Sequence, residues 1–132
     1  MFIETKDMLR PKIYVIRKRK VYDVDYVSFD DKYYGVTEED GLFDEYTFNE
    51  VALMDNTGYK DKNGKYIYEG SIVKNDVGIY TIKRSEGYKF ISMYNGSLYV
   101  LLDEKICREI EVIGNIYENK EWVNDITKTI RI

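Results

Sequence analysis

The chain has no histidine, one cysteine and one proline among its 132 residues. Without histidine, the commonest nitrogen ligand of zinc and copper is missing, and catalytic triads built on histidine are excluded. The lone Cys107 cannot form an intramolecular disulfide, and its neighbours Ile106 and Arg108 indicate a strand position. We therefore expect Cys107 to be a small buried hydrophobic residue, and we expect neither a metal ion nor a cofactor.

Long apolar runs and phosphate-binding loops are also missing from the sequence. No stretch approaches the roughly 20 apolar residues that span a bilayer, and no basic segment followed by an apolar run opens the chain. Neither Gly-x-x-x-x-Gly-Lys-Ser/Thr nor Gly-x-Gly-x-x-Gly occurs, and Asp61-Lys62-Asn63-Gly64 lacks the further acids of an EF-hand loop. We expect a soluble cytoplasmic protein with no membrane partner.

The charges are present in number but are unevenly distributed along the chain. The net charge is −4, and nearly every charge between Asp23 and Glu50 is acidic. Immediately before this acidic stretch lies a basic run, Arg17, Lys18, Arg19 and Lys20. The run could contact phosphates and bind nucleic acid. Alternatively, it is a hairpin turn whose cations pair with the acidic stretch, and the negative net charge favours this second interpretation.

Apolar periodicity predicts short strands joined by turns. Residues 13–16 and 21–27 should pair as strands with 17–20 as their turn, and residues 29–36 add a third strand. The acidic residues 38–46 are interpreted as a loop and a short strand. Further strands are predicted at 77–83, 88–93, 97–102 and 110–117, with turns at 85–87 and 95–96. These patterns predict one domain over residues 1–132, mainly β, with small barrel-like or sandwich-like antiparallel sheets and little helix.

Residues 57–74 carry the densest group of turn signals. Asn63-Gly64 predicts a tight turn, Glu69-Gly70 predicts a second turn, and the apolar residues nearby are expected in the core, namely Ile67, Ile72 and Val73. The structural interpretation is that the glycines allow the chain to turn. The alternative is a loop that contacts a ligand through Lys60, Asp61, Lys62 and Lys65.

Residues 57–73 resemble the signature of the YopX-like proteins of bacteriophages and prophages, and residues 111–119, Glu-Val-Ile-Gly-Asn-Ile-Tyr-Glu-Asn, resemble a second motif of that family. Ser71 and Lys120 stand where the family often has aspartate and proline. The resemblance implies a mostly β fold, a phage or prophage origin and a family without an established biochemical function. The turn residues of the two motifs are Gly58, Asn63, Gly64, Glu69, Gly70, Gly114 and Asn115.

Aromatic residues are abundant, with 14 tyrosines and a single tryptophan, Trp122. Tyrosine combines a large apolar area with a polar tip, so it suits a strand in a half-exposed sheet. The same residues could form a protein interface or stack on unpaired bases. Trp122 could cap the core or anchor a partner chain.

Three functions are compatible with these patterns. We expect a non-enzymatic interaction or assembly module with an unknown protein partner or with itself, because catalytic constellations are missing while edge strands and aromatic surfaces suit association. The first alternative is nucleic-acid binding through residues 17–20 with Tyr14 and Tyr22. The second is an enzyme in which two carboxylates converge, drawn from Asp103, Glu104, Glu109 and Glu111.

Overall fold

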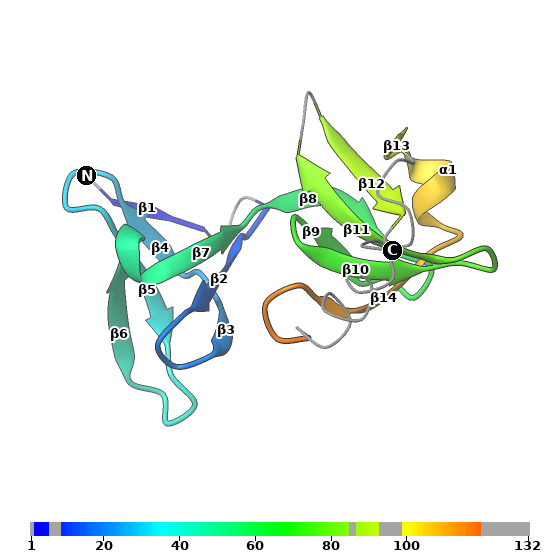
Figure 1. The fold of residues 1–132 in the computed structure, drawn as a ribbon. Helices are drawn as coiled ribbons and strands as arrows, with labels where there is room; N and C mark the ends of the chain where they lie inside the picture. Colours follow the sequence, from blue (N-terminus) through cyan, green and yellow to red (C-terminus); the bar gives the residue numbers. More distant parts are fainter. Residues whose placement is uncertain (1, 6–8, 85–86, 93–98, 120–132) are drawn as a thin grey trace. The chain divides into compact units, whose positions relative to one another are not determined.

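The computed structural model describes residues 2–5, 9–84, 87–92 and 99–119, and it is mainly β. The chain divides into two compact units, Met1–Asn56 and Thr57–Ile132 (Figure 1). Each unit has its own buried cluster of apolar residues. The sequence predicts one domain over residues 1–132, and that the two units form one domain stays a prediction. Residues 85–86 of the predicted turn at 85–87, the predicted turn at 95–96 and Trp122 lie outside the described residues.

The N-terminal unit contains two antiparallel sheets. The first has the order β1-β4-β5-β6, formed by Phe2–Glu4, Tyr26–Ser28, Tyr33–Thr37 and Phe43–Thr47. The second has the order β3-β2-β7, formed by Lys20–Asp23, Lys12–Val15 and Val51–Met54. A short 3-10 helix, η1, spans Phe48–Glu50 and leads from β6 into β7.

The predicted first hairpin is confirmed, because β2 pairs antiparallel with β3 around the basic turn. The predicted strand at 21–27 is wrong in one respect, since the chain leaves the sheet after Asp23 and re-enters a different sheet at Tyr26. The two residues in this break, Val24 and Asp25, form backbone hydrogen bonds with other segments. The N–H of Val24 donates to Pro11 O at 3.1 Å, and the N–H of Asp25 donates to Gly35 O at 2.8 Å. Alternation of apolar residues continues through the break, so periodicity alone could not locate it.

The core of the N-terminal unit is formed by side chains from both of its sheets, namely Ile13, Val15, Tyr22, Val24, Val36 and Tyr46. Tyr22 and Tyr46 lie with ring centroids 5.8 Å apart, and the Glu38 carboxylate accepts a hydrogen bond from each of their hydroxyl groups. Several predicted strand tyrosines therefore have the structural role expected from the sequence.

The C-terminal unit is built on a five-stranded antiparallel sheet with the order β13-β12-β11-β10-β14. Its strands are Tyr99–Leu101, Tyr88–Ser92, Ile79–Arg84, Ser71–Lys74 and Glu111–Asn115. A separate two-stranded sheet is formed by β8, Asn56–Lys60, and β9, Tyr66–Tyr68. The sequence therefore predicted the strands well, and the described residues form several small antiparallel sheets without a closed barrel.

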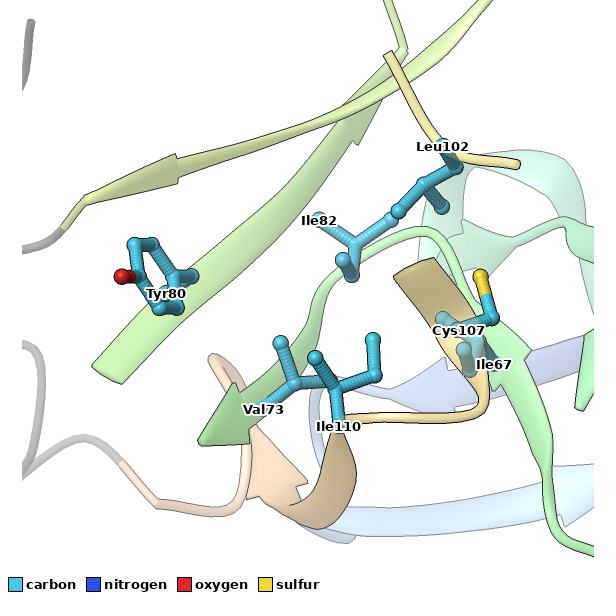
Figure 2. Packing of buried hydrophobic residues seen from close by; sticks show 7 residues of the cluster. All are labelled: Ile67, Val73, Tyr80, Ile82, Leu102, Cys107 and Ile110. Carbon is cyan, nitrogen blue, oxygen red and sulfur yellow. The ribbon is translucent and has the colours of Figure 1, made fainter. Parts of the chain in front are cut away.

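Cys107 lies in a short helix, α1 (Glu104–Cys107), so its predicted strand position is wrong. The helix begins where the Asp103 side chain accepts a hydrogen bond from the Ile106 N–H at 2.8 Å, which is the usual role of an N-cap aspartate. The predicted burial is confirmed, and Figure 2 shows Cys107 among Ile67, Leu102 and Ile110. Burial raises the pKa of its thiol to about 11, so it stays protonated at neutral pH.

Candidate functional site

The basic run forms the turn between β2 and β3, and two of its four cations are engaged by carboxylates. Lys18 Nζ lies 3.1 Å from Glu38 Oε1 and 3.9 Å from an Asp44 oxygen, while Lys20 Nζ lies 2.7 Å from Glu39 Oε1. Arg17 and Arg19 are exposed. The structure thus brings the basic turn against the acidic stretch, as the second interpretation of the charge pattern predicted.

Glu38 connects the β2–β3 hairpin to the β5–β6 hairpin of the N-terminal unit. Its carboxylate accepts hydrogen bonds from the Tyr46 hydroxyl at 2.8 Å, the Tyr22 hydroxyl at 3.0 Å and the Lys18 ammonium at 3.1 Å. These donors stabilise the ionised form, so the Tyr46 hydrogen bond foremost, and then Lys18, lower the pKa of Glu38. Hydrogen bonds to Tyr46 and Glu38 raise the pKa of Lys18, which keeps its charge.

Two adjacent apolar side chains, one at the end of the β5–β6 turn and one at the first residue of β6, are exposed to solvent. Leu42 is 66% exposed and Phe43 is 76% exposed. They are bordered by three carboxylates, and we name this surface the acidic tip, defined by Glu39, Asp40, Leu42, Phe43 and Asp44. Together with Lys18, Lys20 and Glu38, these residues line an open cavity of about 530 Å³.

Backbone hydrogen bonds fix the conformation of the acidic tip. The Glu38 N–H donates to Leu42 O at 2.8 Å, and the Gly41 N–H donates to Glu38 O at 2.9 Å. Asp40 Oδ1 accepts from the Leu42 N–H at 3.0 Å. Gly41 has φ +85°, a conformation that favours glycine, so the sequence and the turn geometry agree here. The tip is therefore a preformed turn.

The residues of the two family motifs come together within the C-terminal unit. The side chain of Asp61 is buried, with Oδ1 accepting from the N–H groups of Asn63 and Lys65, and Oδ2 accepting from the Val112 N–H, each at 2.9 Å. Asp61 thereby joins the first motif to the second. The Ile116 N–H also donates to Gly70 O at 2.9 Å. This geometry supports the structural interpretation of the signature.

Turn residues of both motifs have local structural roles. Gly58, Gly64 and Gly70 all have positive φ, and Glu69-Gly70 forms the predicted turn before β10. Ser71 Oγ accepts from the Tyr68 N–H at 2.9 Å, a bond that an aspartate at this position could also accept. A side chain at Gly114 would collide with Asn119, and Asn115 Oδ1 accepts from the N–H groups of Tyr117 and Glu118.

The predicted ligand loop of the first motif borders an open cavity of about 520 Å³, lined partly by Lys60, Asp61, Glu104 and Arg108. Asp61 is already occupied by three backbone donors, and Lys60 Nζ lies 5.0 Å from the centroid of the Tyr66 ring. Lys62 and Lys65 are exposed, and Lys62 approaches Glu111 at 3.9 Å. The loop is thus held mainly by contacts within the unit.

The four carboxylates of the enzyme alternative have separate surroundings. Asp103 caps α1, Glu104 pairs with Arg108, and Glu111 lies near Lys62 and Lys74. Glu109 is exposed at the end of the helix. The structure does not gather them into one cleft. In the described part of the chain, no group of three or more metal-ligating side chains occurs, and no helix is long and apolar enough to cross a membrane.

Comparison with known proteins agrees with these observations. Residues 13–124 match the family described as YopX protein, which is most of the chain. The chain belongs to the YopX family. The fold is similar to the crystal structure of protein EF1440 from Enterococcus faecalis, with a TM-score of 0.58 and 21% identity, covering 86% of this chain and 96% of that one. No curated protein matches the sequence. The YopX resemblance expected from the two motifs is thereby confirmed.

The acidic tip of this YopX-family chain was not predicted from the sequence. Leu42 and Phe43 lie in a stretch that was interpreted only as an acidic loop and short strand. A usable signal was present, because the Asp40-Gly41 turn is followed at once by two large apolar residues within a run of carboxylates. Their exposure, in contrast, depends on how the hairpin packs, which the linear pattern does not contain.

Proposed function

We propose that this YopX-family chain is a non-enzymatic protein-interaction module, encoded by a phage or prophage and acting in the cytoplasm of its host cell. We place the binding surface at the acidic tip. The single observation that carries the proposal is the pair of large, neighbouring apolar side chains, Leu42 and Phe43, exposed by 66% and 76% on a preformed turn. The interaction-module interpretation of the sequence is thus given a specific surface.

The energetics support a partner at this surface. Removing apolar surface from water stabilises a protein or a complex by about 25 cal/mol per Å². In the isolated chain most of the Leu42 and Phe43 side-chain surface remains in water, so this stabilisation is still available to a complex. The tip is already ordered by its backbone hydrogen bonds, so binding would lose little conformational entropy. An exposed aromatic residue on a rigid turn is the kind of side chain that dominates many protein interfaces.

Charge selects the chemistry of the partner. The cavity beside the two apolar side chains is lined by two lysines, which pair with acidic neighbours, and by four carboxylates, so its net charge is negative. A complementary surface would have an apolar pocket bordered by lysine or arginine. Nucleic acid fits this surface poorly because phosphates would meet carboxylates. Binding of nucleic acid at Arg17 and Arg19 stays a separate prediction, with affinity that falls steeply as salt rises.

The test is retention of host proteins by the tagged full chain after nuclease treatment, with three proteins compared. These are the wild type, the double variant Leu42→Ser with Phe43→Ser, and the control Val77→Ser, in which the side chain is 87% exposed on the C-terminal unit. Circular dichroism checks that all three remain folded. We expect a discrete protein to be retained by the wild type and the control and lost with the double variant.

Two results would contradict the proposal. Equal retention by the double variant would remove the acidic tip as the binding surface. Recovery of nucleic acid, with every protein lost after nuclease, would instead favour the basic turn, and Arg17→Glu with Arg19→Glu should then abolish it. Substituting these arginines leaves the acidic tip intact, so the two surfaces are distinguished by separate variants.

A further inference from the structure

The strand β7 forms an edge of the three-stranded sheet β3-β2-β7 in the N-terminal unit. It pairs with β2 in a register that places Tyr14 opposite Ala52, and the Ile16 N–H donates to Glu50 O at 3.2 Å. Hydrogen-bonded pairs alternate in an antiparallel ladder, so Ala52 bonds inward to Tyr14. Val51 and Leu53 therefore direct their backbone N–H and C=O groups outward, away from β2.

Among the residues that the structure describes, the side chains of β7 itself do nothing to protect this edge. The strand consists of Val51, Ala52, Leu53 and Met54, and none of them is charged. Natural edge strands usually carry charges or proline that block pairing with another chain. The edge strand β6 follows this rule, because Asp44 and Glu45 lie near its middle. Leu53 is 38% exposed, so an apolar side chain accompanies the outward backbone groups of β7.

The outward pattern of β7 is complementary to itself. If two copies align antiparallel about a two-fold axis at Ala52, Val51 of each copy meets Leu53 of the other. Both residues point their backbone groups outward, so each such pair exchanges two N–H···O bonds. Ala52 then faces its own copy as a non-hydrogen-bonded pair, with Cα atoms about 4.5 Å apart, where a small side chain fits. No like charges meet along the strand.

We propose that β7 is a homodimerisation edge, pairing antiparallel with β7 of a second copy and continuing the β3-β2-β7 sheet across the two-fold axis. The occupant is the same strand of another chain, because the edge is uncharged and its hydrogen-bonding pattern matches itself. The surface is separate from the acidic tip. The two-fold interface would give the assembled protein two copies of the tip, whichever partner the tip binds.

Disulfide trapping tests the register. Cα atoms about 4.5 Å apart lie within the range for a disulfide, so Ala52→Cys should cross-link two copies under mild oxidation. The native Cys107 is buried and is retained in every protein. Val77→Cys is the control for random collision, since Val77 is 87% exposed. We expect a covalent dimer from Ala52→Cys that forms faster than from the control and is lost when Leu53→Lys is added.

Sedimentation of the protein without added cysteine provides the second measurement. We expect the wild type to sediment at twice the 15.7 kDa mass of the chain and Leu53→Lys to shift to the single-chain mass. The lysine would place a charge on the edge strand and so disfavour its pairing with a second copy. Circular dichroism should show that the variant keeps its β fold. A monomeric wild type, or Ala52→Cys cross-linking no faster than Val77→Cys, would overturn the proposal. Loss of the dimer with retained partner binding would leave the acidic tip unaffected.

Discussion

The buried carboxylate of Asp61 gives the acidic residue in the turn of residues 61–65 a structural role. Three backbone N–H groups from two distant parts of the C-terminal unit point at one side chain. A carboxylate offers acceptors to all of them, whereas an amide offers only one accepting atom. The Asp61 side chain therefore links residues 61–65 to β14.

Asp61→Ala should lower the free energy of unfolding by about 2–4 kcal/mol, because it leaves these backbone donors without their acceptor in a buried site. Urea denaturation followed by circular dichroism measures the change. Asp76→Ala is the matched control, because Asp76 is exposed in the turn between β10 and β11. This substitution should change the free energy of unfolding little. Equal effects of the two substitutions would contradict the structural role of Asp61.

Glu38 should make stability depend on acid pH. Its pKa in the folded protein is lowered, chiefly by the Tyr46 hydrogen bond, from the ordinary 4.5. A lowered folded pKa means that the contribution is fully present above the unfolded pKa and is lost as pH falls through the folded pKa. The wild type should therefore lose more stability than Glu38→Gln as pH falls below 4.5.

The measurement is a series of urea unfolding curves from neutral pH into this acid range. Glu39→Gln serves as the control because Glu39 is also paired with a lysine, but its side chain is 86% exposed. The control should retain the wild-type pH dependence. If Glu38→Gln retains it as well, the Glu38 cluster does not stabilise the folded state.

At the scale of elements, turns built on glycine were predictable from their own residues, whereas the β2–β3 turn was predicted only from the strands on either side of it. Asn63-Gly64 was predicted because both residues tolerate positive φ, and Gly64 has φ +81°. The β2–β3 turn closes through Arg19, which has φ 55° and gives no such signal. The helix α1 was missed, because four residues are too few for a helical period and only the Asp103 cap marks its start.

Arg19→Gly should be neutral or stabilising by up to about 1 kcal/mol, because an arginine at positive φ is strained and glycine is not. Arg17→Gly removes the same side chain from the same turn at a position without positive φ. We expect this control to be destabilising by about 0.5–1 kcal/mol through the greater freedom of glycine in the unfolded chain. Thermal unfolding of both variants compares them, and the reverse order would contradict the assigned turn.

At the scale of the whole molecule, the sequence predicted the fold class and the family but not where exposed surfaces would lie. Ile67, Ile72 and Val73 were expected in the core and are fully buried. A short apolar run bounded by turn signals predicts a buried strand even without alternation, and Ile72 and Val73 are adjacent and both buried. The cluster around Glu38 joins residues from separate strands, and the exposure of Leu42 and Phe43 depends on the same packing. Such long-range contacts have no fixed spacing in the sequence, so only the structure could locate the candidate site.

The central claim is that the chain binds a protein through its acidic tip, and photo-crosslinking from position 43 tests it most directly. The chain would carry p-benzoylphenylalanine in place of Phe43, or in place of Val77 as the exposed control, in nuclease-treated host lysate. We predict one discrete protein cross-linked from position 43 and absent from position 77. Identical cross-links from both positions, or none from position 43, would contradict the account.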